Sequence, residues 1–153
     1  MFQKIMVAYD ESREAGKALE VAIELARVLG AELKVVTVLE PLPAYFSFAV
    51  SAVLAVDWKD EQRARYTALQ ERARRQAEAA GLHFDTELIN GDEVGSIIGC
   101  ARKYQSDLLV LGMRKHTLLM GHTGQDIAER SPCALLGVPA PLASLRLNPL
   151  RHI

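Results

Sequence analysis

One loop of this chain combines glycines and cations in a pattern typical of phosphate binding. The stretch VLGMRKHTLLMGHTG, residues 110–124, begins as an apolar strand-like run and leads into a helical pattern, QDIAERS. Glycine lets the backbone come close to a ligand, and the free N–H groups at a helix start attract anions. The predicted binding residues of this loop are Leu111, Gly112, Arg114, Lys115, Gly121, His122, Thr123 and Gly124.

Each part of this loop also has a purely structural interpretation. Gly112 could serve only as the turn that ends a strand, and Arg114 and Lys115 could be solvated loop charges. Thr123 could cap the helix whether or not it meets a phosphate. The N–H groups of residues 121–124 would attract an anion whatever the side chains are, so the helix start is the better half of the predicted site.

Asp10 is a second candidate for ligand binding. It ends the apolar run KIMVAYD, residues 4–10. Its carboxylate could accept a hydrogen bond from a ribose hydroxyl or hold a magnesium ion. It could equally cap the helix that is predicted to begin at Arg13, because aspartate is a favoured capping residue. The sequence leaves both interpretations open.

The two histidines of the loop do not form a recognisable catalytic or metal site. His116 and His122 are six residues apart, which matches no spacing of a zinc pair on one helical face. No nucleophile is paired with His122. We therefore predict no metal ligand and no catalytic residue.

The elements that must position these residues alternate between strand and helix. Apolar, β-branched runs predict five strands, and apolar positions at helical spacing predict helices between them. This order is typical of an α/β fold with one doubly wound parallel sheet and helices on both faces. The predicted strands are 4–10, 32–40, 83–89, 106–112 and 133–138, and the predicted helices are 13–29, 60–80, 93–105 and a short one that ends at 130.

The predicted sheet brings the candidate residues to one edge. Ligands of such sheets bind outside the carboxyl ends of the strands, near the point where the strand order reverses. Asp10, residues 38–40 and the loop from Gly112 onward all follow predicted strands at that edge. Ser12 and Asp92 are the predicted caps of the helices that begin beside it.

Composition narrows the class of protein. A chain of 153 residues indicates one domain, and a net charge of -1 gives no overall attraction to nucleic acid or to an anionic membrane. The arginines of the helix at 60–80 are interleaved with acids and predict a solvated face. Cys100 and Cys133 are far apart, and no signal peptide is visible, so we expect reduced, buried thiols in the cytoplasm.

An uncharged stretch, residues 42–56, needs its own interpretation. It is shorter than the ~20 residues that span a bilayer, and prolines stand at its start, so we expect no membrane span. It could be the start of a helix packed in the core. Alternatively, it could be an apolar lid beside the pocket or a contact with a partner.

Taken together, these segments resemble the universal stress protein family. The resemblance runs from about Lys4 to Val138 and rests on four stretches in the right order: KIMVAYDES, LKVVTVLEP, NGDEVGSIIGCARKYQSDLLVLGMR and IAERSPCALLGV. It implies a flavodoxin-like sheet ordered 3-2-1-4-5 and a cytoplasmic homodimer that pairs through the strand at 133–138. It also implies that Asp10 and the backbone of Val38 contact a nucleoside.

The phosphate motif of the ATP-binding branch of that family is incomplete here. The family motif is G-x2-G-x9-G-[ST], and its first glycine falls on Gly112. Its second falls on Lys115, and its last falls on Gly121, with His122 where Ser or Thr is expected. Eight residues separate Gly112 from Gly121, four fewer than in the motif.

The resemblance therefore leads to two functional hypotheses. In the first, residues 1–138 form a stress-response regulator that binds an adenine nucleotide, ATP or AMP and ADP, and residues 139–153 form a proline-rich tail. In the second, the same fold is a homodimeric interaction module that binds no nucleotide. A flavodoxin-like redox carrier is disfavoured, because the flavin-binding loop patterns are missing.

Overall fold

A single five-stranded parallel sheet forms the centre of the molecule. The computed structural model describes residues 1–41, 52–114 and 122–140, and the strands are ordered β3-β2-β1-β4-β5, as the family resemblance implies. The strands are β1 (Lys4–Ala8), β2 (Glu32–Leu39), β3 (Phe84–Asn90), β4 (Leu108–Met113) and β5 (Ala134–Pro139). The helices are α1 (Arg13–Leu29), α3 (Ala52–Ala79), α4 (Glu93–Tyr104) and α5 (His122–Arg130).

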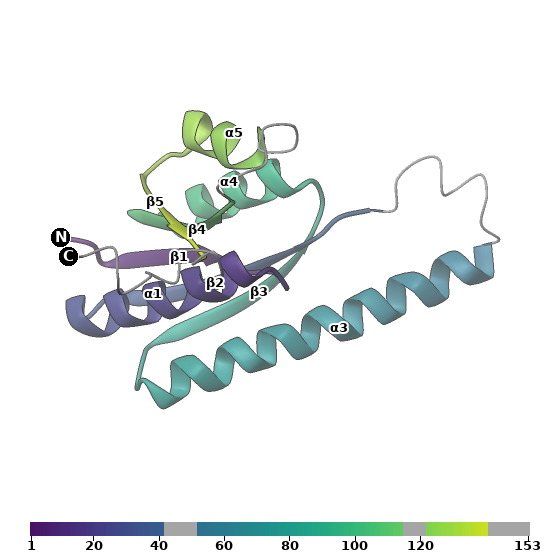
Figure 1. Ribbon diagram of the computed structural model, residues 1–153, viewed down its shortest axis with the longest axis horizontal. Coiled ribbons are helices and arrows are strands. Elements are labelled where there is room, and N and C mark those ends of the chain that lie inside the picture. The colour runs from purple at the N-terminus through teal and green to yellow at the C-terminus, as the bar shows by residue number, and fades with distance from the viewer. Residues whose placement is uncertain (42–51, 115–121, 141–153) are drawn as a thin grey trace, which may run out of the picture.

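Helices cover both faces of the sheet (Figure 1), so the strands are buried on two sides and are apolar on both. On one face, α1 and α3 pack on residues such as Val7 and Val35. On the other face, α4 and α5 pack on Met6 and Val36. Val7 pairs with Val35 of β2 and with Val110 of β4, which places β1 at the middle of the sheet.

The ends of the helices follow the capping residues that the sequence predicts. The Ser12 hydroxyl oxygen accepts a hydrogen bond from the Ala15 N–H at 3.1 Å and caps α1. Asp92 caps α4 in the same way, through the Gly95 N–H at 2.7 Å. Gly30 ends α1 with φ of 65°, a left-handed conformation that glycine adopts without strain. These interactions set where the first turns of α1 and α4 lie.

α3 is longer than predicted and extends past the sheet (Figure 1). Its 28 residues span about 42 Å, but among its described side chains the buried ones, Leu69, Ala73 and Ala77, are all in the carboxyl half. Val56 is 56% exposed and Trp58 is 39% exposed. Of the two interpretations of the apolar stretch, a helix start packed in the core is therefore wrong for Leu54 and Val56, which are exposed; residues 42–51 lie outside the described part.

The last strand and the thiols differ slightly from the predictions. β5 begins and ends one residue after the predicted strand 133–138, so it includes Pro139, the first residue of the predicted tail. Residues 141–153 lie outside the described part. Cys100 is buried as expected, whereas Cys133 is only partly buried, and both are free thiols. In the described ranges, no helix is long and apolar enough to cross a membrane.

Candidate functional site

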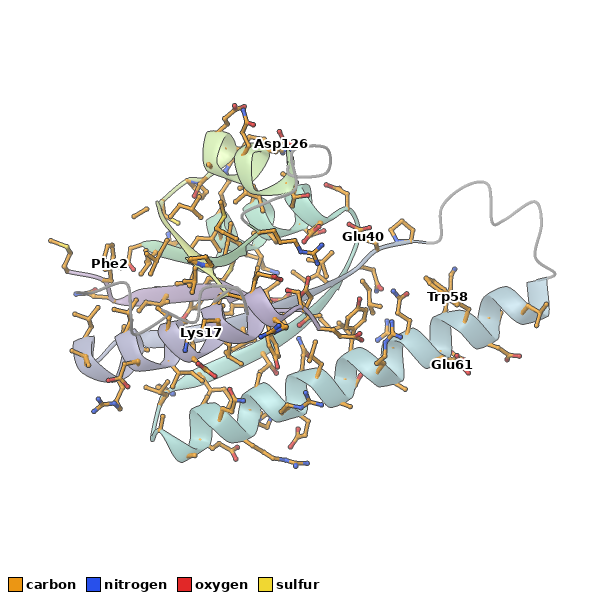
Figure 2. The ribbon with its side chains drawn as sticks, in the orientation of Figure 1. Phe2, Lys17, Glu40, Trp58, Glu61 and Asp126 are labelled. Carbon is orange, nitrogen blue, oxygen red and sulfur yellow. The ribbon has the colours of Figure 1, made fainter. Side chains whose placement is uncertain are left out.

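A cavity of about 400 Å³ lies at the carboxyl ends of β1, β2 and β4. The first turns of α1, α4 and α5 form its sides, together with Gln62 and Tyr66 of α3. Glu40, which lines it, stands just beyond the end of β2, at the opposite end of the sheet from Phe2 (Figure 2). The cavity is therefore at the edge of the sheet where the sequence predicts a ligand.

The structure brings most of the predicted binding residues into this cavity. The predicted binding residues that line it are Asp10, Val38, Leu111, Gly112, Arg114, Thr123 and Gly124. Lys115 and Gly121 lie outside the described residues, and of His122 only the backbone, at the start of α5, is described. Segments that are more than 100 residues apart in the chain thus meet around one space.

Asp10 is not the cap of α1. Its Oδ1 accepts a hydrogen bond from the Ser12 N–H at 2.7 Å, and Ser12 in turn caps the helix. In the part of the chain that is described, the other oxygen of Asp10 has no hydrogen-bond partner. Since Asp10 also lines the cavity, this oxygen remains available as an acceptor for a ligand hydroxyl.

Gly112 is required for packing, a reason that neither sequence interpretation included. A Cβ at this position would lie 2.5 Å from the carbonyl carbon of Glu14 and 2.6 Å from the nitrogen of Ala15. Both are backbone atoms of the first turn of α1, which cannot move away without shifting the helix. The absent side chain lets β4 approach the start of α1, and both then form one wall of the cavity.

Met113 joins the start of α5 to the edge strand. Its sulfur lies 3.3 Å from where a Cβ on Gly124 would be, and its Cγ lies 2.5 Å from where a Cβ on Gly137 would be. The thioether therefore packs against two glycines, one in α5 and one in β5.

Residues 123 and 124 line the cavity in the first turn of α5, where backbone N–H groups have no intrahelical partner. This arrangement provides anion-binding donors on one side of the cavity.

Three glutamates also line the cavity; the sequence places Glu40 at this edge of the sheet, but none of the three is among the predicted binding residues. Glu14 and Glu93 are in the first turns of α1 and α4, and Glu40 follows β2. Arg114 Nε lies 3.6 Å from Glu14 Oε2. Burial, Glu40 and Asp10 together raise the pKa of Glu93, against the opposing effect of Arg114. The cavity wall is therefore rich in carboxylates.

The sequence did contain a signal for two of these glutamates. Glu14 and Glu93 each come one or two residues after a helix cap, Ser12 and Asp92, and both helices begin at the ligand-binding edge. What the sequence does not show is the proximity of the two first turns, which results from the fold.

No group of three or more His, Cys, Asp or Glu side chains within the described ranges is arranged to hold a metal ion.

An ion pair outside the cavity joins α3 to the turn between β1 and α1. Arg65 Nε lies 2.5 Å from Glu11 Oε1, in the turn between β1 and α1. The Arg65 guanidinium also lies 5.8 Å from the centre of the Tyr66 ring. Both side chains of the ion pair are substantially exposed, so the pair contributes little stability. Gln62 and Tyr66, on either side of Arg65 in the sequence, line the cavity.

The family model and the curated relatives that match this chain name the same family. The model of the universal stress protein family matches residues 1–139. A Thermus aquaticus protein described as a universal stress protein in the QAH/OAS sulfhydrylase 3′ region is 32% identical over 142 residues, which cover 89% of this chain and 98% of the relative. Bacillus subtilis YxiE, also described as a universal stress protein, is 26% identical over 145 residues, 89% of this chain and 98% of the relative.

Solved structures of universal stress proteins have the same fold. UspA from Lactobacillus plantarum superposes with a TM-score of 0.74 at 19% identity, over 90% of this chain and 97% of the other. An Arabidopsis thaliana protein of the family with AMP bound gives 0.70 at 16% identity, over 97% and 98% of the two chains. An Archaeoglobus fulgidus protein in complex with dAMP gives 0.66 at 19% identity, over 90% and 98%.

Proposed function

This chain belongs to the universal stress protein family, and we propose that it is a regulatory protein that binds an adenine nucleotide in the cavity at the strand ends. The observation that carries the proposal is the meeting of Asp10, Val38 and the first turn of α5 around one space of about 400 Å³. That volume is in the range of small-molecule sites. Structural neighbours with AMP, dAMP and cAMP support the ligand class.

The nucleoside would lie toward β2 and the phosphate toward β4 and α5. β1 separates β2 from β4, so the two ends of the site are two strand spacings, about 9.5 Å, apart. Asp10 and the backbone of Val38 would bind the nucleoside. Thr123, Gly124 and Arg114 would bind the phosphate, and Lys115, Gly121 and His122 belong to this end on sequence grounds.

The shortened loop would limit the number of phosphates that are held. The four missing residues remove backbone N–H groups that would surround the outer phosphates, and Lys115 replaces a motif glycine. The start of α5 keeps its donors and the positive end of its dipole, which is worth about 0.3–1 kcal/mol for a nearby anion. AMP and ADP should therefore bind at least as well as ATP.

The protein would act as a ligand-biased switch and not as a fast enzyme. No general base is paired with a nucleophile or a water site in the described ranges, so ATP hydrolysis would be slow at most. We further propose a cytoplasmic homodimer that pairs through β5, with residues 141–153 as a separate tail.

The location of the site can be tested by NMR. Titration of the ¹⁵N-labelled protein with AMP should shift the amide resonances of Gly112, Thr123 and Gly124 more than those at the amino ends of the strands, such as Phe84. AMP should also shift the amides of Val38 and its neighbours. Shifts confined to another surface, or no shifts at millimolar AMP, would contradict the proposed function.

A further inference from the structure

Within the described ranges, the charged side chains that line the cavity are mostly negative. Of its carboxylates, Asp10 accepts a hydrogen bond from the Ser12 N–H, and Glu14 is near the Arg114 guanidinium. Glu40 and Glu93 have no hydrogen-bond or ion-pair partner in the part of the chain that the structure describes. Among the side chains that the structure describes, a phosphate that enters the cavity therefore meets one guanidinium, already shared with a carboxylate, and two carboxylates without partners.

Glu93 is held firmly in this position. It is the first residue of α4 and follows the cap Asp92, whose carboxylate accepts the Gly95 N–H at 2.7 Å. A Cβ on Gly95 would lie 2.6 Å from Asp92 Oδ2, so the cap closes tightly because residue 95 is glycine. The partly buried side chain of Glu93 lines the cavity, whereas Glu40 is exposed. Among the unpartnered carboxylates, Glu93 is thus the one that solvent screens less.

We propose that Glu93 is a specificity-determining residue that disfavours nucleotides with additional phosphate charge, so that the cavity prefers AMP to ATP. This inference rests on the proposed function. Arg114, at the proposed phosphate end, acts electrostatically on Glu93. Each further phosphate at that end therefore brings negative charge within range of a partly buried carboxylate, where repulsion is stronger than in bulk water. A binding site can gain specificity by repelling the competing ligand as well as by attracting the preferred one.

Two neighbouring carboxylates already act on Glu93 in addition to its burial. Burial of Glu93 and the charges of Glu40 and Asp10 raise its pKa, and Arg114 only partly compensates. The charged groups that act on it are Glu40 from the end of β2, Asp10 from the end of β1 and Arg114 from the end of β4; Glu14 of α1, which also lines the cavity, lies beside Arg114. An added phosphate would act on Glu93 in the same direction as the two neighbouring carboxylates do.

The test compares AMP and ATP affinity in three proteins by calorimetry. Glu93→Gln removes the charge and keeps the shape. Glu78→Gln is the matched control: it removes the same charge from an exposed position on α3, 16 residues and about 24 Å along the helix from Gln62. Glu93→Gln should tighten ATP binding about tenfold and change AMP binding much less, and Glu78→Gln should change neither.

The outcomes separate this inference from the proposed function. If the wild-type protein binds AMP but Glu93→Gln leaves the ratio of the two affinities unchanged, the inference is wrong and the proposed function stands. If the wild-type protein binds neither nucleotide, the proposed function fails. ATP binding that appears only in Glu93→Gln would then support the charge barrier, and no binding by either protein would overturn it as well.

Discussion

Gly112 shows how a single residue can serve both the fold and the site. Its missing side chain lets β4 lie against the first turn of α1, and Asp10, Ser12 and Glu14 are thereby placed beside the end of β4. A motif glycine that suggests phosphate contact is thus also a packing requirement. Its effect on ligand binding must therefore be separated from its effect on stability.

Replacing Gly112 should destabilise the fold even without a ligand. In Gly112→Ala the new methyl group would overlap the backbone of α1, and overpacking of this kind costs about 1–3 kcal/mol. Gly99→Ala is the control, because nothing lies within 4 Å of a Cβ there and α4 should gain from the better helix former. Urea unfolding measures both. Equal stability of Gly112→Ala and the wild-type protein would show that β4 and α1 are not in close contact.

Asp10 is expected to matter more for binding than for stability. Asp10→Asn can keep an oxygen acceptor for the Ser12 N–H while it removes the charge, so its stability should stay close to that of the wild-type protein. Asp10→Ala loses that hydrogen bond, which costs about 0.5–1.5 kcal/mol. Both variants should weaken AMP binding, because the acceptor for the ribose is lost. Thermal melts with and without AMP separate the two effects, and unchanged AMP affinity in both variants would mean that Asp10 only shapes the turn.

At the scale of elements, α3 has two halves with different roles. The carboxyl half packs on β2 and β3 through Leu69, Ala73 and Ala77, and the amino half extends beyond the sheet. Between them, Gln62 and Tyr66 reach the cavity. Stability should therefore depend strongly on the second half and little on the first.

Two substitutions in α3 test this division. Leu69 is 5% exposed, so Leu69→Ala should lower the free energy of unfolding by about 2–5 kcal/mol. Val56 is 56% exposed, so Val56→Ala should change it by less than about 0.5 kcal/mol. Urea unfolding again gives both values. A large loss in Val56→Ala would show that the projecting half is packed against another part of the protein.

The success of the sequence predictions also varies by element. The caps Ser12 and Asp92 and the stop at Gly30 were predicted because each depends on local residue chemistry. The exposure of the start of α3 was not predicted, because an apolar stretch at the end of a helix looks the same in sequence whether it is buried or exposed. The Glu14–Glu93 side of the cavity was missed because only the strand order brings two residues from different helices together.

The whole molecule should be a homodimer. β5 is an edge strand of the sheet, with β4 on one side and no strand on the other in the described part. An edge strand of this apolar character leaves backbone groups that a second copy can pair with. Light scattering at micromolar concentration should give twice the monomer mass of 16.8 kDa. A monomer under these conditions would contradict the pairing.

Titration of the intact protein with adenine nucleotides tests the proposed function most directly. In titration calorimetry with AMP, ADP and ATP, we expect heat of binding with AMP and ADP, at affinities within about tenfold of each other, and no tighter binding of ATP. Tight, selective ATP binding would require outer-phosphate contacts that the shortened loop lacks. No heat and no thermal shift with any of the three at millimolar concentration would contradict nucleotide binding, and would support the homodimeric interaction module instead.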